Sequence, residues 1–142
     1  FQETAIKEKV ADKAEKYCII LDDCVGDVKF MGSKEFTSLF IKSRHYNCTV
    51  FFLTQHFKRV PKICRLQASY LMFFAISNTE AEVLAEEFAP PNVPKKQFMR
   101  LIDDTLQKRF DFLSINMKSP WESRFRKGLG MAIDLEQYRK PI

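Results

Sequence analysis

Two acidic side chains directly follow a short apolar run near the start of the chain. Residues 17–21 are apolar, and Asp22 and Asp23 end the run. Four apolar residues followed by two acids form a Walker B pattern, in which a strand holds a carboxylate rigidly at the edge of a sheet. There Asp22 would hold Mg²⁺ through a water molecule, and Asp23 would polarise the water that attacks a bound triphosphate. Solvated acids that simply end a strand give the same pattern, so both interpretations stay open.

A polar residue also follows the next apolar run. The run at residues 48–53 ends at Thr54 and Gln55. The carboxyl ends of parallel strands meet at one edge of an open sheet, where ligands bind. Gln55 could there sense the γ-phosphate or orient the attacking water. The sequence therefore predicts ATP and Mg²⁺ as cofactors, with Asp22, Asp23 and Gln55 as the residues that bind them.

Basic residues near these runs suggest two further roles. Arg44 follows the predicted helix between the runs and could act as an arginine finger on a neighbouring subunit's nucleotide. It could equally be a surface arginine that favours the helix dipole. Four more basic residues cluster after the second run: Lys58, Arg59, Lys62 and Arg65. They could follow a DNA backbone, which the net charge of +5 permits, although most charge runs are solvated faces.

The elements that must position these residues alternate between helical and strand patterns. Strands are predicted at 17–21, 48–53, 69–75 and 110–116. Helices are predicted from Gln2 to Lys16 and after Ser33, Ser77 and Pro94. Continuous apolar strands are typical of parallel sheets that are covered on both faces. The alternation thus predicts an α/β fold with a mostly parallel sheet.

The composition is that of an intracellular globular domain. Hydrophobic residues make up 46% of the chain and charged residues 29%. No apolar run approaches the roughly 18 residues that a membrane helix needs, so no membrane is expected as a partner. The four cysteines form no CxxC pair, which indicates a reducing compartment. A zinc site built from Cys24, His45, Cys48 and His56 would match no common ligand spacing.

The combination of these segments resembles the genome-packaging ATPases of poxviruses and other large DNA viruses, which belong to the FtsK–HerA superfamily of DNA-pumping motors. The resemblance rests on CIILDDC at residues 18–24 and SRHYNCTVFFLTQHFKRVPKICR at residues 43–65. It implies a P-loop NTPase fold of the RecA/FtsK–HerA type. Residues 1–116 would be the C-terminal part of the ATPase core, with the Walker B and sensor strands, and residues 117–142 a basic tail.

The same resemblance implies residue roles and a function. By position, Asp22 and Asp23 are the Walker B acids, Gln55 is the sensor, and Arg44 is a candidate trans-acting arginine. The implied function is that of an ATP-hydrolysing motor subunit that forms a ring, expected to be a hexamer, and moves double-stranded DNA into capsids. A capsid or portal protein would be a further partner. The place of action would be the virus assembly site in the host cytoplasm, or the virion.

One element of the implied family is absent. None of the four glycines begins a GxxxxGK[ST] phosphate-binding loop. We therefore expect the chain to be a fragment whose loop lies upstream of Phe1, and to be inactive as an ATPase alone.

Other functions remain open on the sequence. The Walker B pattern also suits other P-loop DNA helicases or translocases, and a non-catalytic interaction module would use its acids structurally. A phosphoacceptor signalling domain would need an acceptor Asp at the end of a middle strand, which the run at 48–53 lacks.

Overall fold

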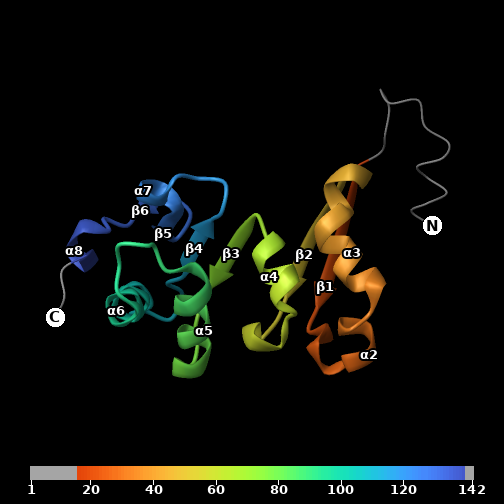
Figure 1. Ribbon diagram of the computed structural model, residues 1–142, viewed down its shortest axis with the longest axis horizontal. Helices are drawn as coiled ribbons and strands as arrows, with labels where there is room; N and C mark the ends of the chain where they lie inside the picture. Colours follow the sequence, from red (N-terminus) through yellow and green to blue (C-terminus); the bar gives the residue numbers. More distant parts are fainter. Residues whose placement is uncertain (1–15, 140–142) are drawn as a thin grey trace. The chain divides into compact units, whose positions relative to one another are not determined.

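The computed structural model describes residues 16–139, and the chain divides into two compact units between Gln67 and Ala68 (Figure 1). The helix predicted from Gln2 falls on residues 1–15, outside the described residues. No helix within residues 16–139 has both the length and the apolarity needed to cross a membrane.

The first unit is built on two parallel strands. β1 (Tyr17–Asp22) pairs with β2 (Cys48–Leu53) over their full lengths, with Tyr17 opposite Cys48 and Asp22 opposite Leu53. The remaining elements of the unit are η2 (Cys24–Gly26), α2 (Val28–Met31), α3 (Lys34–Lys42), η3 (Ser43–Tyr46), η4 (Phe57–Arg59) and α4 (Lys62–Gln67). The predicted cap at Ser33 begins α3, because its hydroxyl accepts a hydrogen bond from the Phe36 backbone N–H at 3.0 Å.

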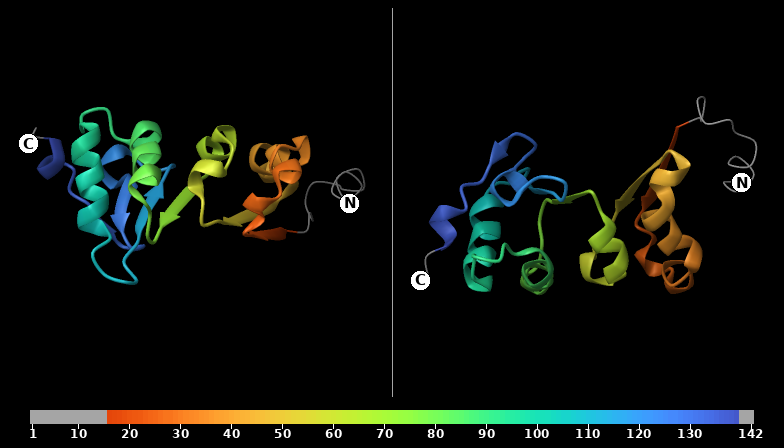
Figure 2. Two further views of the ribbon diagram at one scale, coloured as in Figure 1. Left: turned by 90° about the horizontal axis from the view of Figure 1, so that it is seen from below. Right: turned by 45° about the horizontal axis from the view of Figure 1, so that its top comes forward.

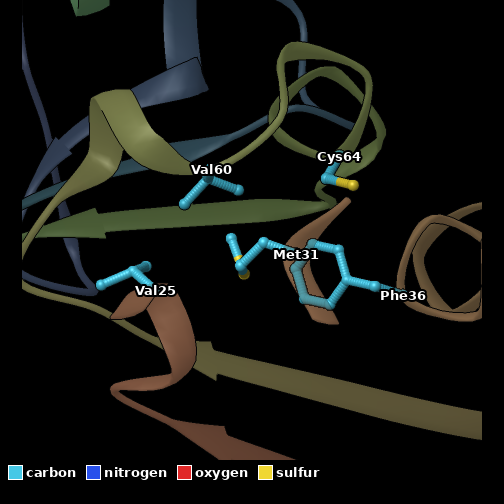
Figure 3. Packing of buried hydrophobic residues seen from close by; sticks show 5 residues of the cluster. All are labelled: Val25, Met31, Phe36, Val60 and Cys64. Carbon is cyan, nitrogen blue, oxygen red and sulfur yellow. The ribbon is translucent and has the colours of Figure 1, made fainter. Parts of the chain in front are cut away.

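Phe36 lies at the centre of the first unit's core. It is fully buried, and its ring contacts the rings of Phe30, Phe40 and Phe52 at centroid distances of 5.2, 5.1 and 5.5 Å. Figure 3 shows the buried residues of this cluster: Val25, Met31, Phe36, Val60 and Cys64. Edge-to-face and tilted ring pairs add to the burial of apolar area. The core therefore ties α3 and α4 to the inner face of β2.

The other face of the two strands is not covered within the unit. Helices α3 and α4 lie on the same side of β1 and β2 (Figure 2, left view). On the opposite side Ile20, Phe51 and Leu53 are each more than half exposed. The exposure alternates along both strands, as a sheet with one covered face requires.

The second unit is an antiparallel sheet with two long helices. Its strands follow the order β3 (Tyr70–Phe73), β4 (Leu113–Asn116), β5 (Phe125–Lys127) and β6 (Met131–Ala132), and each neighbouring pair is antiparallel. The helices of the unit are α5 (Asn78–Phe88), α6 (Lys95–Thr105), α7 (Trp121–Arg124) and α8 (Glu136–Arg139). α5 and α6 lie side by side (Figure 1). Phe98 of α6 packs edge-on against Phe125 of β5, with ring centres 5.2 Å apart.

The predicted mostly parallel sheet of the P-loop NTPase type is wrong for this structure. In the described residues the parallel pair is β1–β2, while the strands predicted at 69–75 and 110–116 pair with each other in antiparallel fashion. One crossover helix returns the chain to the start of a strand and yields a parallel neighbour. Between β3 and β4 the chain instead forms two helices in succession, α5 and α6, and comes back to the end of the sheet at which β3 finishes. β4 therefore runs antiparallel to β3.

The segment expected as a basic tail contributes to the second unit's sheet and core. β5 pairs with β4 in the register Ile115 opposite Phe125, and both side chains are fully or almost fully buried. Tyr138 of α8 donates a hydrogen bond to Asp104 of α6 at 3.1 Å. Burial, followed by that hydrogen bond, raises the pKa of the Tyr138 hydroxyl.

Replacement of Phe36 by alanine should unfold the first unit. Loss of a fully buried phenylalanine costs about 3–5 kcal/mol, a large share of the stability of any small domain. We expect amide hydrogen exchange, followed by mass spectrometry, to lose protection across β1 and β2. Val28→Ala, at an exposed position of the same unit, is the control and should keep that protection. Unchanged protection from hydrogen exchange in Phe36→Ala would contradict a core that is centred on Phe36.

Candidate functional site

The ends of β1 and β2 bring the predicted acids and the predicted sensor to one edge. Asp22 lies opposite Leu53 in the parallel register, and the Asp23 backbone N–H donates to the Leu53 carbonyl at 3.0 Å. Gln55 follows Leu53 after a single intervening residue. Asp22, Asp23 and Gln55 are all exposed. Their side chains therefore share the carboxyl-end rim of the pair, where an open α/β sheet binds ligands.

The backbone turns sharply at Asp23. This residue has φ 48° and ψ 37°, in the left-handed region, which aspartate tolerates better than most residues with a Cβ atom. The chain then enters η2, and Cys24 Sγ donates weakly to the Asp22 carbonyl at 3.4 Å. Asp22 thus belongs to the rigid strand, whereas Asp23 begins the loop. The carboxylates of these two neighbouring residues can therefore point in different directions.

Thr54 shapes the loop that carries Gln55. Its hydroxyl oxygen accepts a hydrogen bond from the His56 backbone N–H at 2.9 Å. A threonine that bonds two residues ahead closes a tight turn around the residue between them. No role for Thr54 was predicted from the sequence, although a threonine at a strand end is the type of residue that forms this turn.

Arg44 lies at the other end of the strand pair. It belongs to η3, just before β2 begins, while Asp22 and Gln55 follow the strand ends. Six strand residues at about 3.3 Å each separate these ends by about 20 Å. Within one chain the structure therefore does not bring Arg44 to the rim that holds Asp22.

The four predicted DNA-contact residues differ in their surroundings. Lys58, Arg59 and Lys62 are exposed on η4 and at the start of α4, whereas Arg65 is 8% exposed. The Arg65 guanidinium donates to the carbonyls of Val60 and Lys58 at 2.5 and 3.1 Å. It also lies 5.1 Å from the centre of the Phe57 ring. Arg65 thus holds the backbone of the segment that carries the three exposed cations.

The residues at the rim suit magnesium better than zinc. Among residues 16–139, no three His, Cys, Asp or Glu side chains gather closely enough to hold a metal ion. Mg²⁺ keeps several waters and is commonly bound through one or two carboxylates, which Asp22 and Asp23 provide. Cys48 of the conceivable zinc set lies at the start of β2, away from the rim, and burial raises the pKa of its thiol, which disfavours the thiolate that zinc requires.

Replacement of Arg65 by alanine should destabilise the segment that it bonds. The change leaves the Val60 and Lys58 carbonyls without this donor, at a cost of about 1–3 kcal/mol. We expect a lower urea midpoint and faster hydrogen exchange in residues 57–67. Lys62→Ala removes the same charge from an exposed position of α4 and should change stability by less than about 0.5 kcal/mol. Equal stability of the two variants would rule out the structural role of Arg65.

Comparisons with known proteins agree with the family that the motifs indicate. A family model described as Poxvirus A32 protein matches residues 1–115. The matched range includes both strand ends of the candidate site. No curated protein and no solved structure matches the chain. The match spans well over half of the 142 residues, and the chain therefore belongs to the poxvirus A32 family of genome-packaging ATPases, as its sequence motifs predicted.

Proposed function

We propose that this chain carries part of the hydrolysis site of an ATP-driven motor that packages double-stranded viral DNA. The observation that carries the proposal is the shared rim of Asp22, Asp23 and Gln55, fixed by the parallel register and the Asp23–Leu53 hydrogen bond. Family membership supports an ATPase in viral DNA packaging. We also propose that the motor cycle is that of the FtsK–HerA superfamily, and that the complete protein is a member of it.

Each rim residue has a separate task in this proposal. Asp22, at the rigid end of β1, would hold Mg²⁺ through a water molecule, and the ion would supply positive charge beside the phosphates. Asp23, turned into the loop, accepts a hydrogen bond from the attacking water and polarises it. Gln55, held by the Thr54 turn, donates to the γ-phosphate or to the same water.

The described residues supply one side of such a site. None of the four glycines begins a phosphate-binding loop, so the backbone cradle and its lysine must come from another segment. Asp22 and Asp23 would then act on a nucleotide that is bound mainly by that other segment.

The position of Arg44 fits a site shared between subunits. Since Arg44 lies at the opposite end of β2 from Gln55, it could reach a nucleotide only on a neighbouring copy. Ring assembly, expected as a hexamer, would supply that arrangement. The arginine would offset charge that develops on the transferred phosphoryl group.

The exposed cations after β2 are the proposed DNA contacts. Lys58, Arg59 and Lys62 would neutralise phosphates of the duplex without reading its sequence. Arg65 would act indirectly, because its guanidinium is bonded to the backbone of this segment. We further propose that the motor docks on a capsid or portal protein. It would act at the virus assembly site or in the virion.

Neutralising either rim acid should abolish turnover in a complete protein that contains the phosphate-binding loop. We expect Asp22→Asn and Asp23→Asn to lower the ATP hydrolysis rate by about 100-fold or more, since each removes a group that acts on Mg²⁺ or on the attacking water. Asp27→Asn is the control, because asparagine caps a helix as well as aspartate does and Asp27 caps α2.

The nature of the DNA substrate separates the motor from other P-loop enzymes. Stimulation of hydrolysis by duplex DNA supports a packaging motor, whereas stimulation by single strands alone would favour a helicase. Wild-type turnover in both rim variants would refute the hydrolysis site.

The 142-residue chain by itself should bind ATP weakly. Most of the binding energy for the phosphates comes from backbone amides and a lysine that these residues do not provide. We expect calorimetry with MgATP to give a dissociation constant weaker than about 100 μM, equivalent to less than about 5.5 kcal/mol of binding free energy. A micromolar constant that is lost in Asp22→Asn would show that the rim binds the nucleotide unaided.

A further inference from the structure

A cleft of about 480 Å³ opens in the second unit, where β3 ends and α6 ends. Its apolar lining consists of Phe74, Ala75, Ile76, Ala81, Ile102 and Leu106. Small-molecule sites have a similar size and a similar mixture of apolar walls and a few polar groups. The volume therefore suits a ligand as large as one nucleotide.

One exposed phenylalanine ring lines the cleft, and a second, outside the lining, directly follows the lining residue Arg109 in the sequence. Phe74 lines the cleft and is 58% exposed, and its far side is supported by Phe112, with ring centres 4.9 Å apart. Phe110 is 80% exposed, and the Arg109 guanidinium lies 5.3 Å from its ring centre. Exposed rings beside cations are suited to stacking on the faces of nucleic-acid bases.

The rim of the cleft carries positive charge that is not neutralised by ion pairs. Lys108 and Arg109 both line the cleft, and among residues 16–139 no carboxylate forms a salt bridge with either one. Asn78 and Gln107 add amide groups, and Asp103 is an acidic group on the same rim. Asp111, which pairs with Lys127, also interacts electrostatically with Lys108, so the rim keeps a smaller positive excess that rests mainly on Arg109.

The loop that presents these cations is already ordered. Asp111 accepts a hydrogen bond from the Lys108 backbone N–H at 3.1 Å and forms a salt bridge with Lys127 at 2.8 Å. The Lys127 hydrogen bond holds the pKa of Asp111 below its usual value. Just after the loop, the Phe112 carbonyl accepts a hydrogen bond at 2.8 Å from the N–H of Gly128, the residue that follows β5. A ligand would therefore meet a prearranged surface, which lowers the entropic cost of binding.

We propose that this cleft, with the loop at residues 107–110, binds an unpaired nucleotide by stacking its base on phenylalanine and placing its phosphate at Lys108 and Arg109. Bases within a duplex are stacked on one another and do not offer their faces, so the aromatic surface selects a single strand. The binding goes beyond duplex packaging and does not depend on hydrolysis at Asp22 and Asp23. The nucleotide could be part of a single strand or a free nucleotide, and competition with AMP distinguishes these two sources.

The test uses the full 142-residue chain and a fluorescein-labelled ten-residue oligothymidylate, with binding followed by fluorescence anisotropy. Phe110→Ala should weaken binding about tenfold, as expected for the loss of one stacked base. Lys108→Ala combined with Arg109→Ala should lower the slope of log affinity against log salt by about 1.4, the value for two phosphate contacts on a single strand. Unlabelled AMP identifies the source: strong competition indicates a free nucleotide, and weak competition a strand.

Matched controls keep the result interpretable. Lys96→Ala combined with Lys118→Ala removes the same charge from exposed positions outside the cleft lining, and Leu129→Ala removes an exposed apolar side chain. These variants should bind like the wild type. Thermal unfolding should be unchanged in Phe110→Ala, because its ring is exposed.

Three outcomes would overturn the site. The first is that neither the labelled oligothymidylate nor AMP binds the chain. The second is equal loss in the cleft and control charge variants, which would indicate nonspecific attraction. The third is a duplex that binds as tightly as the single strand with no effect of Phe110→Ala.

Discussion

The parallel pairing of β1 with β2 is the constraint on which the candidate site depends. A shift of one residue in this pairing would turn either Leu21 or Phe52 away from the Phe36 core and expose it. The same shift would move Asp22 out of line with Leu53 and change its place relative to Gln55. Burial of a few aromatic side chains therefore also sets the geometry of exposed carboxylates. The rim can be solvated and still be accurately placed, because the residues that fix it lie behind it.

Features that depend on neighbouring residues could be predicted from the sequence. The pairing of strands that are far apart in the sequence could not. The helix caps at Ser33 and Ser77 and the strand end at Leu53 depend on neighbouring residues and occur as predicted, while β1 continues one residue beyond its predicted end, to Asp22. The direction of the strand at 69–75 depends on a partner over forty positions later, which apolar periodicity does not encode. The apolar runs also suggested two covered faces, yet Ile20 and Phe51 are exposed in the unit described.

The contrast between Arg65 and its basic neighbours shows why a charge cluster is a weak predictor. All four side chains look alike in sequence, but a buried guanidinium must have its donors satisfied. The carbonyls of Lys58 and Val60 meet that need. Lysine, with a single compact ammonium group, could not also cover the Phe57 ring as a planar guanidinium does. Burial, which the sequence does not display, separates the residue that builds the segment from those that face solvent.

The opposite placement of Arg44 and the rim acids limits how hydrolysis could be arranged under the proposed function. A strand pair is too stiff to bring its two ends together, so one chain cannot use both on one nucleotide. If both act, the nucleotide must lie between the rim of one subunit and the η3 end of the next. Each subunit would then sense its neighbour's nucleotide through the same short strands that hold its own acids.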